Sequence, residues 1–155
     1  MKQETETRQI HTIAPVYDGT SRILILGSFP SVKSRETGFF YGHPRNRFWK
    51  VLAGITGSAV PESVEEKRLF LLEHGIAVWD VIAACTIHGS SDASIRDVVP
   101  NDLTPILETA DIRGIFTNGS TSHRLYQKYQ EPVTGRKAVR LPSTSPANAA
   151  FSYEQ

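Results

Sequence analysis

The feature that most constrains the fold of this chain is a series of four short apolar runs, separated by segments with helical spacing. The runs cover residues 23–26, 76–82, 114–117 and 138–141. Apolar residues at consecutive positions, rather than at alternate ones, are typical of a strand that a parallel sheet buries on both faces. The alternation of strands and helices therefore predicts an α/β fold, a three-layer α/β/α sandwich around a four-stranded parallel sheet with right-handed crossovers.

Length and composition fit one globular domain. A chain of 155 residues with 39% hydrophobic and 21% charged residues can bury a substantial core, so we expect a single domain over residues 1–155. Residues 1–12 are polar, and we expect them to be flexible. Ile13, Val16 and Tyr17 then anchor the chain before the first strand. The net charge of +1 means that any nucleic acid must be attracted by a local patch.

Cysteine and histidine content limits the cofactors. The single cysteine, Cys85, excludes an internal disulfide and a Cys-rich metal site, and we expect it to be a small core residue. The five histidines lack metal-ligand spacing such as H-E-x-x-H. We find neither a signal region nor a run of about 18 apolar residues, which favours the cytoplasm and no membrane partner.

Capping patterns mark the helices between the runs. Ser63-x-x-Glu66 matches a capping box, whose helix is expected to close near Gly75. Asn101 is a candidate cap for a short helix, and Ser145 for a final one. Another helix is expected to bury one face with apolar residues at helical spacing, namely Phe48, Val51, Leu52 and Ile55.

The carboxyl ends of the expected strands carry the polar loops. These are the Gly27–Ser31 turn, the 88–94 loop, residues 118–120 and the 142–146 turn. Ligands of parallel α/β folds bind beyond these ends, so all four loops are expected to meet at one binding rim. Asp80, at the end of the second strand, either faces a ligand or caps a turn, and the sequence leaves both alternatives open.

The stretch from Lys33 to Lys50 is the most informative one for function. It contains an aromatic cluster at 39–41 and five Lys or Arg residues against a single acid, Glu36. Aromatic faces beside positive charge suit a ligand with a flat ring and phosphates, which describes a nucleotide. Three adjacent aromatic residues cannot all point into the core, so at least one is expected to line a surface or a pocket.

Other enzyme classes lack their motifs here. The first turn is neither G-x-G-x-x-G nor G-x-x-x-x-G-K-[ST], and the chain has no G-x-S-x-G elbow. The Gly27–Ser31 turn is compatible with a purely structural role. So is Asn46 as a helix cap, although a capping amide at a cleft can also act on a ligand. His43, His88 and His123 are more typical of loop residues than of general bases.

Three stretches carry a family resemblance: GSFPS at 27–31, GFFYGHPRNRFWKVL at 38–52 and LPSTSPANA at 141–149. Together they resemble the uracil-DNA glycosylase superfamily and, within it, the hypoxanthine-DNA (deoxyinosine) glycosylase branch. The likeness extends from about Val16 to Ala149. In the first motif Phe29 stands where mismatch-specific uracil glycosylases carry an Asn and the common uracil enzymes an Asp.

The resemblance implies a monofunctional glycosylase that hydrolyses the N-glycosidic bond and needs neither metal nor organic cofactor. Phe29 can stack on a base but cannot orient water, so the resemblance assigns catalysis to Asn46. Without a dedicated carboxylate base, the leaving group must contribute. Hypoxanthine leaves more readily than adenine when donors hold its carbonyl oxygen.

The resemblance also implies the site residues. The base pocket would comprise Gly27, Ser28, Phe29, Pro30, Ser31, Phe39, Phe40, Tyr41, Gly42, His43 and Asn118. The DNA contacts would come from basic residues near phosphates and from a turn pressed into the minor groove, namely Lys33, Arg35, Arg45, Arg47, Pro142, Ser143, Thr144, Ser145 and Pro146.

The implied partner is double-stranded DNA that contains a deaminated base, bound by a monomer. Two alternatives stay open. One is a mismatch-specific uracil-DNA glycosylase of the same superfamily. The other is a non-catalytic binder of nucleotides or damaged DNA.

Overall fold

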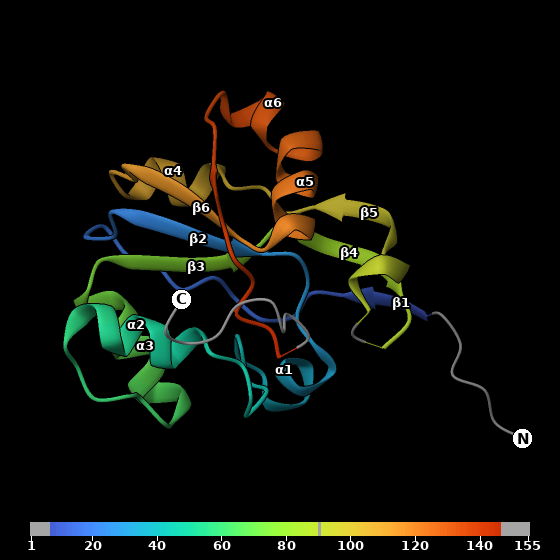
Figure 1. Cartoon of the computed structure of the whole chain (residues 1–155). Helices are drawn as coiled ribbons and strands as arrows, with labels where there is room; N and C mark the ends of the chain where they lie inside the picture. Colours follow the sequence, from blue (N-terminus) through green and yellow to red (C-terminus); the bar gives the residue numbers. More distant parts are fainter. Residues whose placement is uncertain (1–6, 90, 147–155) are drawn as a thin grey trace, which may run out of the picture.

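A parallel sheet lies at the centre of the computed structural model, which describes residues 7–89 and 91–146 (Figure 1). The elements in chain order are β1 (Thr7–Ile10), β2 (Ile23–Gly27), α1 (Val32–Thr37), α2 (Phe48–Thr56), α3 (Val64–Glu73), β3 (Ile76–Asp80), β4 (Ile82–Ile87), the 3-10 turn η1 (Asp92–Ser94), β5 (Arg96–Pro100), α4 (Thr104–Thr109), β6 (Gly114–Asn118), α5 (Ser120–Tyr129), α6 (Glu131–Thr134) and β7 (Val139–Leu141).

The central sheet has the strand order β3-β2-β6-β7, and its three neighbouring pairs are all parallel. This confirms the four-stranded parallel sheet expected from the apolar runs. The register places Gly27 beside Asp80 at the carboxyl ends of β2 and β3. Two residues distant in sequence thus become neighbours at the rim where ligands of such folds bind.

Helices cover both faces of this sheet, as the three-layer prediction requires. Figure 1 shows α4, α5 and α6 on one side and α1, α2 and α3 on the other. Successive side chains of β2 point to opposite faces. Leu24 accordingly belongs to the buried cluster that includes Ile106 of α4, whereas Ile25 belongs to the cluster that includes Phe48 of α2.

A second sheet, with the order β1-β4-β5 and antiparallel pairing, was not expected. The prediction of one strand over residues 76–82 is wrong, because β3 ends at Asp80 and β4 begins at Ile82. Val81 and Ile82 donate backbone hydrogen bonds to Gly27 and Ser28, where the chain leaves the parallel sheet. Both strands are largely buried, so the apolar run shows no break where the pairing partner changes.

Part of residues 1–12, which we expected to be flexible, forms a strand in the structure. Residues 7–10 form β1, which pairs with β4 from Thr7 opposite Ile87 to Ile10 opposite Ala84. The backbone N–H of His11 continues this ladder with the carbonyl of Ala83. The polar composition of this segment gives no apolar pattern from which a strand could be predicted. The strand is instead stabilised by ladder hydrogen bonds with β4. The anchors Ile13 and Val16 are buried as expected.

The helix caps were partly predicted. The Ser63 and Glu66 capping box is present, and Gly75 adopts a positive φ of 68° just after α3. Asn101 is not a cap, since its amide donates to the carbonyls of Asp80 and Ile82 instead. Asp102 takes the capping role by accepting from the Thr104 N–H.

The buried face of α2 differs from the expected one. Phe48, Trp49 and Ala53 are buried, whereas Ile55 is 76% exposed. Ile55 lies in the last turn of α2, which ends at Thr56. The final helix expected after Ser145 falls on residues outside the described ranges. No helix among the described residues is both long and apolar enough to cross a membrane.

Candidate active site

A hollow opens beyond the carboxyl ends of β2, β3 and β6, where the sequence placed the binding rim. The volume of this hollow is about 140 Å³. Its lining consists of Gly27, Ser28, Phe29, Pro30, Ser31, Ser34, Phe40, Tyr41, Asn46, Asp80, Asp92, Asn118, Ser143, Thr144 and Ser145.

Most residues proposed for the base pocket lie in this lining, but three do not. Phe39 is 2% exposed and stacks on Trp49, with ring centroids 6.2 Å apart, so it is a core residue. Gly42 donates its backbone N–H to Ser34, and the ring of His43 accepts from the N–H of Arg45. Gly42 and His43 therefore shape the loop that leads to Asn46.

Asn46 both bonds to the first turn of α2 and lines the hollow. Its side-chain oxygen accepts a hydrogen bond of 2.9 Å from the backbone N–H of Phe48, while Arg47 occupies the cap position of α2. The same side chain lines the hollow. Because the oxygen is held by the helix, the amide N–H₂ is the part of Asn46 left to act on a ligand.

The turn at 143–145 closes the opposite side of the hollow. Asn118 donates to the hydroxyl of Thr144 and accepts from its backbone N–H, both at 3.0 Å. Arg47 donates to the carbonyls of Ser143 and Ser145, both at 3.3 Å. Arg47 thus fixes the closing turn from the side of Asn46.

Aromatic side chains form the apolar wall. Phe40 is 3% exposed and Phe29 is 8% exposed, so only a small part of each ring faces the hollow. The Tyr41 ring stacks on Phe48, with centroids 3.9 Å apart and planes at 16°. The guanidinium of Arg35 lies 5.4 Å from the Phe29 centroid and donates to the carbonyl of Gly89. Arg35 therefore backs this wall.

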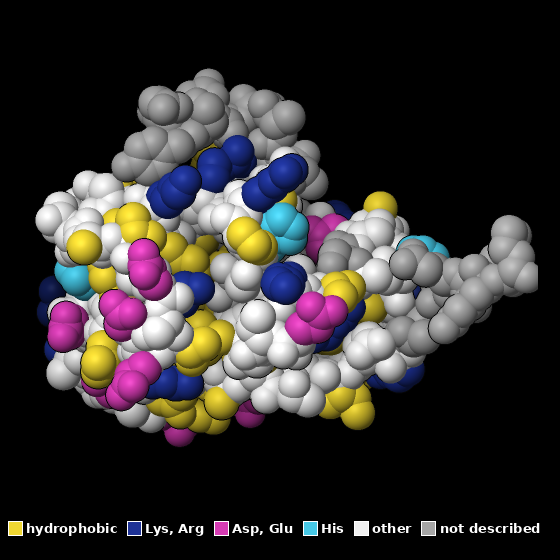
Figure 2. Space-filling view, turned by 90° about the horizontal axis from the view of Figure 1, so that it is seen from below, with side chains coloured by type: hydrophobic (Ala, Val, Ile, Leu, Met, Phe, Trp, Pro, Cys, Tyr) yellow, Lys and Arg dark blue, Asp and Glu magenta, His cyan; other side chains and the backbone are white. Residues whose placement is uncertain are grey.

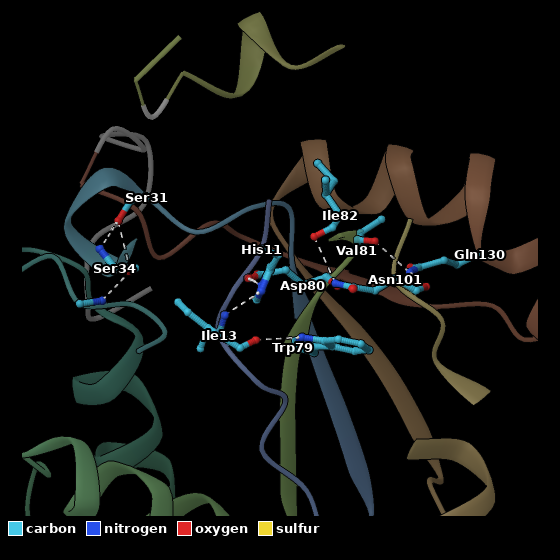
Figure 3. A network of polar contacts seen from close by, with 11 residues as sticks. His11, Ile13, Ser31, Ser34, Trp79, Asp80, Val81, Ile82, Asn101 and Gln130 are labelled. Carbon is cyan, nitrogen blue, oxygen red and sulfur yellow. Dashed lines mark hydrogen bonds and ion pairs between the residues drawn. The ribbon is translucent and has the colours of Figure 1, made fainter. Parts of the chain in front are cut away.

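Two carboxylates, those of Asp80 and Asp92, line the hollow. Asp80 is 4% exposed, and one of its oxygens lies 2.8 Å from Nε2 of His11 (Figure 3). Asp92 receives a hydrogen bond from the Ser28 hydroxyl. Partial burial raises the pKa of Asp92, the bond from Ser28 opposes this, and the charge of Asp80 raises the pKa further.

Tyr41 meets Asp80 beside Gly27. The Tyr41 hydroxyl is buried without a hydrogen-bond partner in the described part of the chain. Burial followed by the charge of Asp80 raises its pKa far above the usual value, and the neighbouring Asn118 side chain opposes this rise. A Cβ on Gly27 would collide with Oδ1 of Asp80 and approach the Tyr41 hydroxyl to 3.1 Å. Glycine is therefore required for these two groups to come together.

Sequence reasoning missed His11 and Asp92, and it left Asp80 undecided. The position of Asp80 at a strand end was a usable signal, because such ends point to the binding rim. His11 stands in a polar segment that had no strand signal, and Asp92 in a loop with several polar residues. Nothing in their local sequence distinguishes either one.

The basic residues proposed for DNA differ in exposure. Lys33 and Arg45 are exposed, and Lys33 lies 3.9 Å from Glu36. Figure 2 shows Lys and Arg side chains close together along the upper part of one face, with Asp and Glu elsewhere on it. Pro142 and Pro146 are exposed at the two ends of the closing turn. Within residues 7–89 and 91–146, no group of three or more His, Cys, Asp or Glu side chains could hold a metal ion.

The chain matches a known family over most of its length. A family model described as the uracil DNA glycosylase superfamily matches residues 14–155, and the chain belongs to this superfamily.

Two curated relatives are both named hypoxanthine DNA glycosylase. The one from Methanosarcina acetivorans is 36% identical over 141 residues, which cover 88% of this chain and 87% of the relative. The one from Methanosarcina barkeri is 34% identical over 139 residues, with 86% and 85% coverage.

A solved structure gives the same picture. The solution NMR structure of a candidate uracil DNA glycosylase from Methanosarcina acetivorans superimposes with a TM-score of 0.80 at 32% identity. The match covers 94% of this chain and 90% of that one. The chain is thus similar to hypoxanthine and uracil DNA glycosylases over nearly its whole length.

Proposed function

We propose that this protein is a monofunctional DNA glycosylase that releases hypoxanthine from deoxyinosine in double-stranded DNA, as the first step of base excision repair. The observation that carries the proposal is the position of Asn46, whose amide lines a hollow between an aromatic wall and the closing turn. The similarity to two proteins named hypoxanthine DNA glycosylase supports the choice of base.

The reaction requires the base to leave the duplex and enter the hollow. Extrusion costs a few kcal/mol, and less for a mispaired nucleotide such as deoxyinosine opposite thymine. Cleavage passes through an oxocarbenium-like sugar, so the site must position a water and stabilise the departing base. The N–H₂ of Asn46 can hold that water near the sugar, because α2 fixes its oxygen.

The closing turn and the basic residues complete the DNA contact. Residues 142–146 would press into the minor groove and fill the space that the base leaves. Arg47 supports this turn through its bonds to Ser143 and Ser145. Exposed Lys33 and Arg45 would contact phosphates, which fixes orientation without reading sequence.

Hydrolysis rather than strand cleavage follows from the same lining. No lysine is among the residues that line the hollow, so the described site offers no amine for a Schiff base with the sugar. An abasic site would therefore be the product. We further propose that the protein acts as a monomer in the cytoplasm.

The decisive experiment is incubation of the protein with a duplex that contains one deoxyinosine opposite thymine, followed by alkali. We expect strand breakage at the inosine only after alkali, and free hypoxanthine in the supernatant. Matched duplexes with uracil or xanthine measure the related activities. An inosine duplex that stays intact through the alkali step contradicts the proposal.

Uracil release is the second candidate activity. The structural neighbour described as a candidate uracil DNA glycosylase favours it. Single-turnover rates on the inosine and uracil duplexes decide between the two, and faster uracil release would reverse the assignment.

A further inference from the structure

The innermost polar groups of the hollow are the Asp80 carboxylate and the Tyr41 hydroxyl. Asp80 is 4% exposed, and the Tyr41 hydroxyl is buried without a hydrogen-bond partner in residues 7–89 and 91–146. Both groups lie against the backbone of Gly27. An unpaired buried hydroxyl costs free energy, so a ligand atom that accepts its proton is the expected partner.

The backbone at Tyr41 is consistent with a functional placement. Its φ of 50° lies in the left-handed region, which is unfavourable for a bulky residue. Stacking on Phe48 holds the ring in place. Such strain is typical of functional sites, where it aims a side chain that an ordinary backbone would direct elsewhere.

His11 determines how Asp80 is oriented. The backbone N–H of Ile13 donates to Nδ1 of His11 at 3.2 Å, so this nitrogen carries no proton and Nε2 carries it. Nε2 donates in turn to Oδ2 of Asp80 at 2.8 Å. One carboxylate oxygen is thereby occupied, and Oδ1, beside Gly27 and Tyr41, is left as an acceptor for a ligand.

The backbone around Asp80 is held just as firmly (Figure 3). The amide of Asn101 donates to the carbonyls of Asp80 and Ile82, at 2.9 and 3.1 Å. The amide of Gln130 donates to the carbonyl between them, that of Val81, at 3.1 Å. Three consecutive carbonyls are thus bound by two buried side chains, which fixes Asp80 at the end of β3.

Asn118, the other amide in the hollow with base-reading chemistry, is engaged elsewhere. Its oxygen accepts from the N–H of Thr144, and its nitrogen donates to the Thr144 hydroxyl. Asp92 is the more exposed of the two carboxylates, and it accepts a hydrogen bond from the Ser28 hydroxyl. The acceptor for a ring N–H is therefore Asp80.

We propose that Asp80 and Tyr41 read the edge of the extruded base that lies farthest from the sugar. Oδ1 of Asp80 accepts from a ring N–H, and the Tyr41 hydroxyl donates to the adjacent carbonyl oxygen. This inference rests on the proposed function and concerns the discrimination of hypoxanthine from adenine, the base from which it forms by deamination. Hypoxanthine, xanthine and uracil carry this edge, as do guanine and thymine, whereas adenine carries the reverse order, a ring acceptor beside an amino donor.

Replacement of Asp80 by Asn replaces the acceptor that faces the base with a donor. Because Nε2 of His11 is a fixed donor, the new amide must turn its oxygen toward His11. Its N–H₂ then takes the place of Oδ1, where it opposes a ring N–H and matches the ring acceptor of adenine. Asp80→Asn is therefore expected to weaken binding of inosine relative to adenosine.

The test is the affinity of two duplexes that resist cleavage, with 2′-fluoro-substituted deoxyinosine or deoxyadenosine opposite thymine at the same position. Fluorescence anisotropy gives both dissociation constants for the parent and for Asp80→Asn. The ratio of the two dissociation constants gives the inosine preference of each protein. The cost of extruding each base is the same for both proteins, so it cancels when the preference of the variant is compared with that of the parent. We expect the inosine preference to fall at least about tenfold, the loss of one good discriminating contact.

Two further variants complete the design. Asp111→Asn removes the same charge from an exposed residue outside the lining of the hollow, and it should leave the ratio of the two affinities unaltered. Tyr41→Phe keeps the ring on Phe48 and removes only the hydroxyl, so it must also lower the inosine preference. An unchanged ratio in either Asp80→Asn or Tyr41→Phe, in protein whose circular dichroism matches the parent, overturns the inference.

Failure of this inference is distinguishable from failure of the proposed function. Hypoxanthine release by the parent protein from an ordinary inosine duplex is measured in parallel. Absence of release refutes the proposed function. Release together with an unchanged preference in the variants refutes only the roles of Asp80 and Tyr41.

Discussion

Asn118 and Thr144 hold each other through two hydrogen bonds of 3.0 Å, which join the end of β6 to the turn that follows β7. One bond uses the Thr144 backbone and the other its hydroxyl. The turn that closes the hollow is therefore attached to the central sheet rather than free to move independently. This attachment predicts how the turn responds to substitution.

Asn118→Ala should loosen the closing turn without unfolding the protein. Loss of two partly buried hydrogen bonds is expected to lower the free energy of unfolding by about 1–2 kcal/mol. The single-turnover rate of hypoxanthine release should also fall, and by more than the loss in the free energy of unfolding alone would cause. The reason is that a misplaced turn no longer supports the extruded base. Thr144→Ser, which keeps both bonds, should retain the parental rate. Equal rates for Asn118→Ala and the parent would contradict the role given to the turn.

Asn46→Ala should nearly abolish cleavage while leaving DNA affinity within a few-fold. Loss of one donor aimed at the reacting centre typically costs about 100- to 1,000-fold in rate. Single-turnover release of hypoxanthine gives the rate, and anisotropy with an uncleavable duplex gives the affinity. Asn46→Asp keeps the oxygen that caps α2 but loses the N–H₂, so it separates capping from catalysis. If the aspartate variant cleaves like the parent, the amide nitrogen has no catalytic role.

Gly27→Ala should damage both stability and activity. The added methyl group would collide with the Asp80 carboxylate and crowd the Tyr41 hydroxyl. Overpacking of this kind costs about 1–3 kcal/mol, which urea unfolding would detect. Gly19→Ala is the matched control, since its Cβ would meet only Thr109 at an ordinary 3.8 Å. A Gly27→Ala protein as stable and active as the Gly19→Ala protein would exclude this crowding.

Tyr41→Phe and Tyr126→Phe should have opposite effects on stability. The Tyr41 hydroxyl has no partner in the described structure, so its removal is expected to leave the free energy of unfolding unchanged or to raise it by about 1 kcal/mol. The Tyr126 hydroxyl donates to the Arg136 carbonyl at 2.6 Å, and its removal should destabilise by about 1 kcal/mol or more. Thermal unfolding of the two variants in parallel measures the difference. Equal destabilisation would mean that Tyr41 is paired in the free protein.

The sequence was sufficient for the central sheet because its strands are buried on both faces. Ile23–Gly27 is an uninterrupted apolar run that ends in a turn, and such a pattern has few other interpretations. The same reasoning failed at Val81, where the chain passes from the parallel to the antiparallel sheet inside one apolar run. Burial leaves a signal in the sequence, but the choice of pairing partner does not.

The site shows the same division. The place of Asn46, Asn118 and the 143–145 turn in the lining of the hollow was predictable, because they follow predicted strands or belong to a family motif. His11 was not found, because its function depends on a partner 69 residues away in the chain. Contacts of this range are set by the pairing of β1 with β4, and local composition carries no trace of that pairing.

If Asp80 reads the base, the pairing of β1 with β4 makes the N-terminal part of the chain contribute to the discrimination of inosine from adenosine. A protein shortened to begin near Ile13 would keep every strand of the parallel sheet. It would nevertheless lack the imidazole that orients Asp80, so we expect it to fold and bind DNA while telling inosine from adenosine less well. Fidelity would then depend on a strand that the catalytic scaffold itself does not need.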